Sequence, residues 1–85
     1  MKDGFYMTAA VRNVTDRIEV DVIESEYADG IYWVIVGNDT VIYDTNNNIK
    51  VMTDIKVGDT IKVMYSGQVM MSYPPQIVAH RVTIK

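Results

Sequence analysis

The chain contains no cysteine and no leucine, and each absence excludes a class of protein. Without cysteine the chain has no disulfides, no thiolate nucleophile and no Cys-based zinc site. Leucine is absent although valine and isoleucine together supply 23 of the 85 residues. Because β-branched side chains lose χ1 freedom in helices and fit pleated sheets, this composition excludes a helical bundle and predicts a single all-β domain over residues 1–85.

Basic residues are also few, with 8 Lys and Arg against 11 Asp and Glu and a formal charge of −3. Nucleic-acid binding draws much of its affinity from phosphates neutralised by Lys and Arg, so we do not expect a nucleic-acid partner. No apolar run approaches the roughly 20 residues that span a bilayer, and residues 1–5 show no apolar segment typical of a signal peptide. The sequence therefore predicts no transmembrane segment.

Apolar residues alternate with polar ones in several short segments, as expected of half-buried strands. Residues 5–12 and 17–22 alternate on either side of the turn formers in residues 13–16, which predicts a hairpin. Residues 60–65 alternate again, and residues 76–85 form a last strand.

The middle of the chain is less regular. Residues 31–36 form a continuous apolar run that predicts a strand covered on both faces, with Trp33 in the core. Gly37-Asn38-Asp39 predicts a tight turn before a further strand over residues 40–43. Residues 53–59 predict one helical turn, capped by Thr53 and ended by Gly58.

Five or six short strands separated by turns are typical of a sandwich or a closed barrel. A sandwich is cramped at 85 residues. We therefore expect an all-β fold, namely a small five- to six-stranded OB-like Greek-key barrel with one short helical turn.

A catalytic centre finds little support in this sequence. Nucleophilic catalysis by Ser or Thr needs a base, which is most often histidine, and His80 is the only histidine. It shares strand parity with Val78 and Val82, which predicts a histidine packed at the end of the barrel. We expect a non-catalytic protein with no cofactor.

Two groups of residues with carboxylate or amide oxygens are candidate cation ligands. Asp44, Asn46 and Asn48 match the first three ligand positions of an EF-hand loop, but Ile49 and Ile55 stand where that loop needs Gly and Glu. An Asx-rich turn is the preferred interpretation. The second group, Glu24, Glu26 and Asp29, lies in one polar loop that is interpreted as a hydrated loop, with weak calcium binding as the alternative.

The aromatic residues raise the possibility of a platform on which bases or sugars stack. The candidates for such a platform are Tyr27, Tyr32, Trp33, Tyr43, Tyr65 and Tyr73. Because several of them fall on positions predicted to be buried, a core role is preferred for Trp33.

One segment combines adaptable apolar side chains with stiff backbone. It consists of Met71, Ser72, Tyr73, Pro74, Pro75 and Gln76. Methionines form adaptable apolar surface, and prolines restrict the loop. If a surface of this domain binds a partner, we expect it to be this segment, whose alternative interpretation is a rigid connector into the last strand.

The last third of the chain contains the motifs D-I-K-V-G-D-T-I-K-V at residues 54–63, Y-S-G at 65–67 and S-Y-P-P-Q at 72–76. Through these motifs, residues 31–84 resemble a bacterial group of small OB-like domains of unknown function. Members are found largely in envelope-associated proteins and lipoproteins of Gram-positive bacteria. They often carry an acid directly before the S-Y-P motif, where this chain has Met71, so no carboxylate role transfers to that position.

The resemblance implies an extracytoplasmic location, no known enzymatic activity and no catalytic residues, while the sequence itself also allows a cytoplasmic location. The leading hypothesis is thus a monomeric protein-interaction or structural module of a secreted or envelope protein. A barrel that binds a small ligand or a divalent cation through Asp44, Glu24, Glu26 or Asp29 is one alternative. A single-strand nucleic-acid-binding OB fold is another, disfavoured by the acidic charge.

Overall fold

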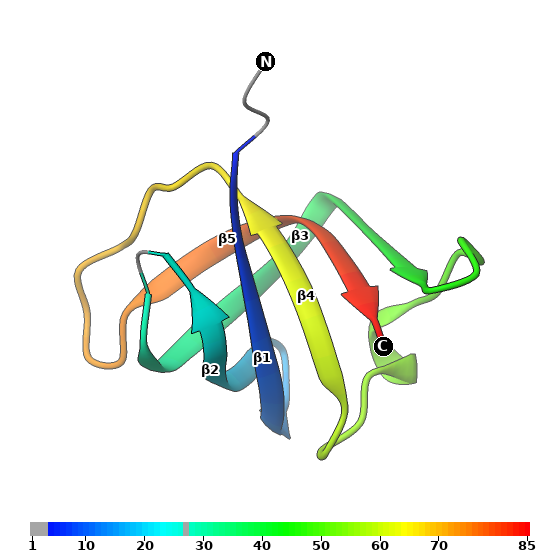
Figure 1. Ribbon diagram of the computed structural model, residues 1–85, viewed down its shortest axis with the longest axis horizontal. Coiled ribbons are helices and arrows are strands. Elements are labelled where there is room, and N and C mark those ends of the chain that lie inside the picture. The colour runs from blue at the N-terminus through cyan, green and yellow to red at the C-terminus, as the bar shows by residue number, and fades with distance from the viewer. Residues whose placement is uncertain (1–3, 27) are drawn as a thin grey trace.

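The computed structural model describes residues 4–26 and 28–85, which form five strands and one short 3-10 helix (Figure 1). In chain order these are β1 (Phe5–Val14), β2 (Ile18–Ser25), β3 (Gly30–Asp44), η1 (Met52–Asp54), β4 (Thr60–Tyr65) and β5 (Gln76–Ile84). The described residues contain no helix long and apolar enough to cross a membrane.

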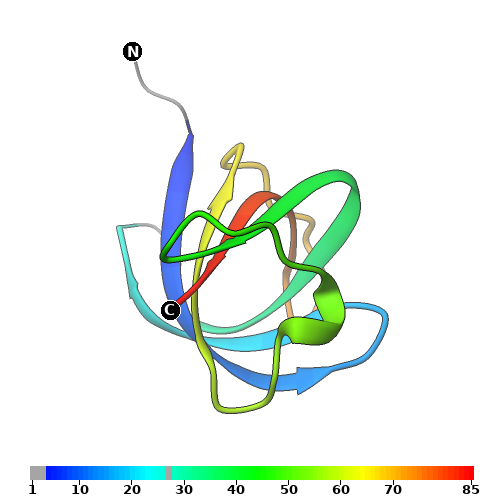
Figure 2. The same cartoon turned by 90° about the vertical axis from the view of Figure 1, so that its right-hand side faces the viewer.

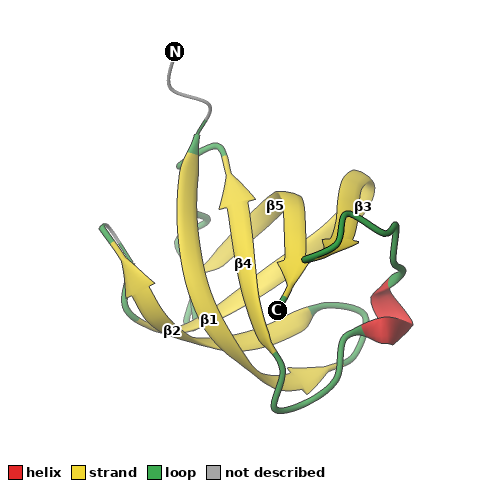
Figure 3. Ribbon diagram, turned by 45° about the vertical axis from the view of Figure 1, so that its right-hand side comes forward, coloured by secondary structure: helices red, strands yellow, loops and turns green. Residues whose placement is uncertain are grey.

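The strands form a closed barrel in the order β1-β2-β3-β5-β4, with β1 pairing to β4 to complete the circle. All neighbours are antiparallel except β3 and β5, which run parallel. Figure 2 shows the strands curving around a common centre, and Figure 3 shows that η1 lies at the edge of the molecule. The predicted small OB-like barrel with one short helical turn is confirmed.

The period-two pattern places one face of each strand inside the barrel, as predicted. The buried side chains are all apolar or aromatic: Met7, Ala9, Val11, Ile18, Val20, Tyr32, Val34, Ile42, Ile55, Ile61, Val63, Tyr65, Ile77, Ala79 and Val82. No polar or charged residue is buried among the residues that the structure describes. Since the interior holds only packing residues, any chemistry of the described chain must take place on the outer surface.

The predictions for the middle of the chain were wrong in two respects. Gly37-Asn38-Asp39 does not separate two strands, because β3 runs through it and bulges away from β5 between Val36 and Val41. Trp33 is not a core residue, because alternation along β3 buries Tyr32 and Val34 and leaves Trp33 half-buried on the outer face.

The prediction for His80 was also wrong. In β5 the pairs Ala79–Tyr65 and Arg81–Met64 leave His80 unmatched in a β-bulge. A bulge moves the following residues to the opposite face of the strand. Ile77 and Ala79 face the core, so alternation already turns Val78 and His80 outward. The bulge then makes Val82, rather than Arg81, the next inward residue.

The helical turn is present, but its cap differs from the predicted one. Asp54, rather than Thr53, accepts a hydrogen bond from the Val51 backbone N–H through its carboxylate, at 2.9 Å. Gly58 follows with a φ of +96°, in the left-handed region that glycine adopts at least cost. Its N–H donates to the Val11 carbonyl at 2.9 Å, which ties this loop to the end of β1.

Candidate functional site

The loop between β4 and β5 ends in a closed, hydrogen-bonded tip, called here the Met70–Gln76 loop. Met70 and Gln76 exchange backbone hydrogen bonds of 2.8 and 3.2 Å. The Ser72 hydroxyl donates to the Pro74 carbonyl at 2.7 Å and accepts from the Gln76 side-chain amide at 3.1 Å. The Tyr73–Pro74 peptide is cis. The hydrogen bonds of Met70, Ser72 and Gln76 give the tip a defined shape.

Two large side chains of this tip project fully into solvent. Tyr73 is 101% exposed and Met71 is 93% exposed, whereas Pro74, Pro75 and Gln76 are partly buried. Exposed apolar groups this large are costly to leave in water and are typical of interaction surfaces when they cluster. The segment singled out in the sequence therefore presents Met71 and Tyr73 outward from a tied backbone.

The base of the loop is anchored to the β2–β3 side of the barrel. The Arg17 guanidinium donates to the Gln76 side-chain carbonyl at 3.0 Å and stacks over the Trp33 ring at 4.4 Å. The Trp33 backbone N–H donates to the Pro75 carbonyl at 2.9 Å. Sequence reasoning missed the role of Arg17, because 59 positions separate it from Gln76 in the chain.

The other aromatic candidates do not gather around this loop. Tyr32 and Tyr65 lie in the core, where burial raises the pKa of the Tyr65 phenol. Tyr43 lies on the outer face under Arg81, and Tyr27 lies outside the described residues. A shared stacking platform is therefore not present among the described aromatic residues.

Asp44 organises the asparagine-rich turn, as the Asx-turn interpretation predicted. Its carboxylate accepts from the backbone N–H groups of Asn46 and Asn48 at 2.8 and 2.9 Å and from the Asn48 side-chain amide at 3.0 Å. These hydrogen bonds, first those from Asn48, lower the pKa of Asp44, and Lys50 adds a favourable charge at 3.9 Å. The carboxylate oxygens thus have local partners already.

The acidic candidates do not come together as a metal centre. Within residues 4–26 and 28–85, no group of three or more His, Cys, Asp or Glu side chains is arranged to hold a metal ion. Glu24 and Glu26 instead line a depression at the end of β2. The structure therefore adds no ligand cluster to the cation-binding alternative.

A second surface, which sequence reasoning missed, lies on the outside of β1, β4 and β5. It is called here the cationic face and consists of Tyr6, Lys62, Met64, Arg81 and Thr83. The Lys62 ammonium lies 4.6 Å from the centre of the Tyr6 ring, and the Arg81 guanidinium lies 4.5 Å from the centre of the Tyr43 ring. Aromatic rings thus hold both cations in place.

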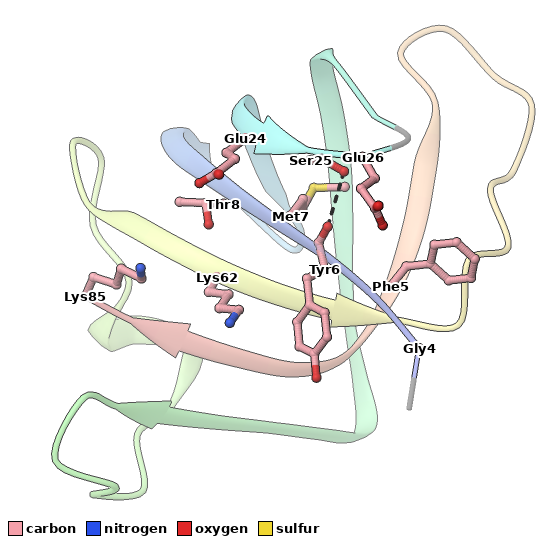
Figure 4. A pocket seen from close by; sticks show the side chains of 10 residues that line it. All are labelled: Gly4, Phe5, Tyr6, Met7, Thr8, Glu24, Ser25, Glu26, Lys62 and Lys85. Atoms are coloured by element: carbon pink, nitrogen blue, oxygen red, sulfur yellow. Dashed lines mark hydrogen bonds between the residues drawn. The ribbon is translucent and has the colours of Figure 1, made fainter. Parts of the chain in front are cut away.

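Two adjoining depressions share Tyr6 and Lys62. One, of about 450 Å³, is lined by the five residues of the cationic face. The other, of about 470 Å³, extends over β1 towards Glu24 and Glu26 on the β2 side and Lys85 on the other (Figure 4). The alternation of residues 60–65 already indicates that Lys62 and Met64 point outward, but only the strand order brings Tyr6 and Arg81 beside them.

The fold and this surface describe a small barrel whose candidate sites lie outside its core. The model of the family "Protein of unknown function (DUF3221)" matches residues 9–84. The chain belongs to this family, which confirms the expectation of an uncharacterised domain family. No curated protein and no solved structure matches the chain.

Proposed function

We propose that this domain is a non-catalytic, monomeric interaction module that docks onto a partner protein through the Met70–Gln76 loop. The observation that carries the proposal is the full exposure of Tyr73 and Met71 on a hydrogen-bonded tip. Because the tip is already ordered, docking loses little conformational entropy. Tyrosine is enriched among the residues that dominate binding energy, since one ring buries a large area.

The tip also suits a partner of defined chemistry. Tyr73 and Met71 carry no charge, and Arg17 at the base of the loop is engaged by Trp33 and Gln76. A concave apolar pocket on the partner, with a hydrogen-bond acceptor at its base for the Tyr73 hydroxyl, would match this surface.

Non-catalytic action is supported by where the titrating groups lie. Perturbed pKa values tend to cluster at active sites. Here the lowered pKa of Asp44 follows from turn hydrogen bonds, and the raised pKa of Tyr65 follows from burial in the core. His80, the chain's single histidine, lies exposed in a bulge of β5.

The proposal places the domain in the bacterial cell envelope or outside the cell. Its support is the resemblance of residues 31–84 to envelope-associated domains, carried by the K-V-G-D and S-Y-P-x-Q motifs. Fractionating cells of the source organism with an antibody against the domain tests this location. Recovery in the cytosolic fraction alone would contradict it.

Photo-crosslinking tests the docking surface directly. A photoreactive phenylalanine analogue replaces Tyr73 in the full-length protein, produced in its own organism, and a matched variant carries the analogue at Val57, an exposed apolar position in the loop before β4. We expect a discrete protein adduct from position 73, which is lost when Met71→Ser is added, and none from position 57.

Two outcomes would reject this docking surface. Equal adducts from positions 73 and 57 would show that contact is non-specific, and the absence of an adduct at position 73 would remove the loop as the contact. An adduct of two copies of the chain would replace the proposed monomer with a self-associating domain.

A further inference from the structure

The cationic face holds two positive charges that are not neutralised by neighbouring acids. In the described part of the chain, the recorded ion pair joins Lys50 and Asp44 and involves neither Lys62 nor Arg81. Each of these two side chains instead lies over a tyrosine ring, at 4.6 Å for Lys62 and 4.5 Å for Arg81. A ring attracts a cation through its quadrupole and leaves the net charge intact. The face therefore presents two positive charges that have no ion-pair partner among the described residues.

The strand register brings these two charges within reach of one ligand. Lys62 lies directly opposite Thr83, and Met64 lies directly opposite Arg81. Lys62 and Arg81 are therefore diagonal neighbours on antiparallel strands, which places their backbones roughly 7–8 Å apart. In the free chain Lys62 leans over Tyr6 of β1 and Arg81 leans over Tyr43 of β3. Both side chains are long enough to swing from these rings to a ligand that sits beside the Thr83 hydroxyl.

The depression lined by the cationic face, called here the groove, has the dimensions and the lining of a small-molecule site. Its volume is about 450 Å³, and pockets for small ligands combine apolar walls with a few convergent polar groups. Tyr6 and Met64 supply the apolar wall, while Lys62, Arg81 and Thr83 supply the donors. Figure 4 shows the Tyr6 and Lys62 side chains in the adjoining depression, whose lining they share with this groove.

We propose that this groove binds a small soluble phosphate monoester. The phosphate accepts hydrogen bonds from the Lys62 ammonium, the Arg81 guanidinium and the Thr83 hydroxyl, and the organic part of the ligand packs against Tyr6 and Met64. This site is separate from the Met70–Gln76 loop and does not depend on the proposed docking function.

Phosphate suits this donor set better than a carboxylate does. A phosphate monoester carries close to two negative charges at neutral pH and three acceptor oxygens, so it can engage two cations and a hydroxyl at once. The planar guanidinium of arginine matches phosphate oxygens in a two-point contact, and lysine adds a point charge. A carboxylate has one charge and two oxygens for the same three donors.

The neighbouring acids limit the ligand to a short one. Glu24 and Glu26 line the adjoining depression, and the chain carries a net charge of −3. An anionic polymer that continued along the surface from Lys62 would meet these carboxylates and be repelled. A single phosphate on a small organic group fills the groove beside Arg81 and stops short of them.

Amide chemical-shift titration of the ¹⁵N-labelled chain with phenyl phosphate tests the proposal. We expect saturable shifts centred on Tyr6, Lys62 and Thr83, at concentrations up to about 10 mM for a single small anion. Phenyl sulfate, which has the same shape and the same three terminal oxygens but only one negative charge, should bind at least about fivefold more weakly because each contact to Lys62 and Arg81 is weaker. Absence of saturable shifts, or equal affinity for the two probes, would overturn the proposal.

Matched variants locate the binding and keep the test independent of folding. Lys62→Gln and Arg81→Gln should each weaken phenyl phosphate binding at least about tenfold, while Lys56→Gln, with the same charge change in the loop before β4, should leave it within about twofold. Unchanged spectra of the free variants establish that they fold. Equal weakening in all three variants would reduce the effect to net charge and reject the site.

Two further probes separate the soluble ligand from other sources of phosphate. Vesicles containing phosphatidic acid carry the same monoester on a membrane, and a short oligothymidylate carries phosphodiesters on a polymer. We expect phenyl phosphate to shift the amide resonances of Tyr6, Lys62 and Thr83. Neither the vesicles nor the oligothymidylate should shift them. Binding to the vesicles or to the oligonucleotide without binding of phenyl phosphate would overturn the proposal in favour of that partner.

Discussion

The Met70–Gln76 loop and the cationic face lie at opposite ends of β5 and are built in contrasting ways. The loop precedes the strand and presents two neutral, fully exposed side chains, Tyr73 and Met71. The cationic face takes Arg81 and Thr83 from the second half of the strand and joins them to β1 and β4. The loop is shaped by hydrogen bonds within seven residues, whereas the face is shaped by the register of three strands.

This contrast bears on what each surface can recognise. Side chains on paired strands have fixed spacing, which suits a small ligand with defined charge positions. A loop tip projects from the barrel and can enter a cavity on a larger partner. The two surfaces share one support, because the inward residues of β5 pack into the core beneath both of them.

Weakening the core under β5 should destabilise the Met70–Gln76 loop and the cationic face together. Ile77 is fully buried at the start of β5, and Ile77→Ala should lower the free energy of unfolding by about 2–5 kcal/mol through lost burial and a cavity. Urea unfolding followed by tryptophan fluorescence measures this. Val78→Ala, at the next and largely exposed position, should cost at most about 0.5 kcal/mol, and similar losses in both variants would contradict a shared core under β5.

Substitutions at glycines should disturb the molecule unequally. Gly67 has a φ of +97°, and a Cβ there would overlap the Phe5 ring, whereas Gly58 has a φ of +96° with open space around it. Gly58→Ala should cost roughly 1 kcal/mol of unfolding free energy from backbone strain, and Gly67→Ala roughly 2–3 kcal/mol because Phe5 must also move. Urea unfolding compares them.

The glycine pair also sharpens the comparison of surfaces. Phe5 precedes Tyr6 in β1, so Gly67→Ala should shift the amide resonances of Tyr6 as well as those of the Met70–Gln76 loop. Gly58→Ala should leave both sets in place. Equal unfolding free energies for the two variants would show that Phe5 gives way without cost.

Much of the barrel could be predicted because alternation reports directly on burial. The alternation of residues 60–65 and the strand predicted for residues 76–85 correspond to β4 and β5, and Ile61, Val63 and Tyr65 are the alternate residues of β4 that the structure buries. The failures occur where alternation is interrupted. The bulge at His80 changes the face of the strand without any change in residue type, and the apolar run around Trp33 gives no period from which to choose a face.

The two candidate sites also differ in how far the sequence alone can reveal them. The Met70–Gln76 loop is contiguous, so its composition alone draws attention to it. The cationic face joins Tyr6, Lys62 and Arg81, which lie far apart in the chain, and it exists only because β4 pairs with both β1 and β5. The net charge of −3 does not indicate the cationic face either, because a total charge does not report a local excess of positive side chains.

Loosening the anchor of the loop should affect one surface and spare the other. Arg17→Ala removes the hydrogen bond to Gln76 and the stacking on Trp33, which should lower the free energy of unfolding by about 1–2 kcal/mol. Because Trp33 is the only tryptophan, its emission should move to longer wavelength as water reaches the ring.

Arg12→Ala, at an exposed position in β1, is the control and should change the free energy of unfolding by less than about 0.5 kcal/mol. Phenyl phosphate affinity at the cationic face should be the same in both variants, and a loss confined to Arg17→Ala would show that the surfaces are coupled.

The smallest effect is expected at acidic pH, at the edge of the cationic face. Hydrogen bonds from Asn48 and Asn46 lower the pKa of Asp44 below its usual value in the folded chain. The unfolded chain therefore takes up a proton at a higher pH than the folded chain does, so this stabilisation is complete above about pH 4 and is lost as the pH falls through the lower, folded pKa.

Asp44→Asn should remove this part of the acid dependence, as measured by urea midpoints between pH 6 and pH 2. Asp39→Asn, at an exposed position in the β3 bulge, should retain it. Because Asp44 directly follows Tyr43, whose ring holds Arg81, protonation should shift the amide resonances of Tyr43 and Arg81 before those of Ser72 and Tyr73, and a simultaneous shift of both groups would contradict the independence of the two surfaces.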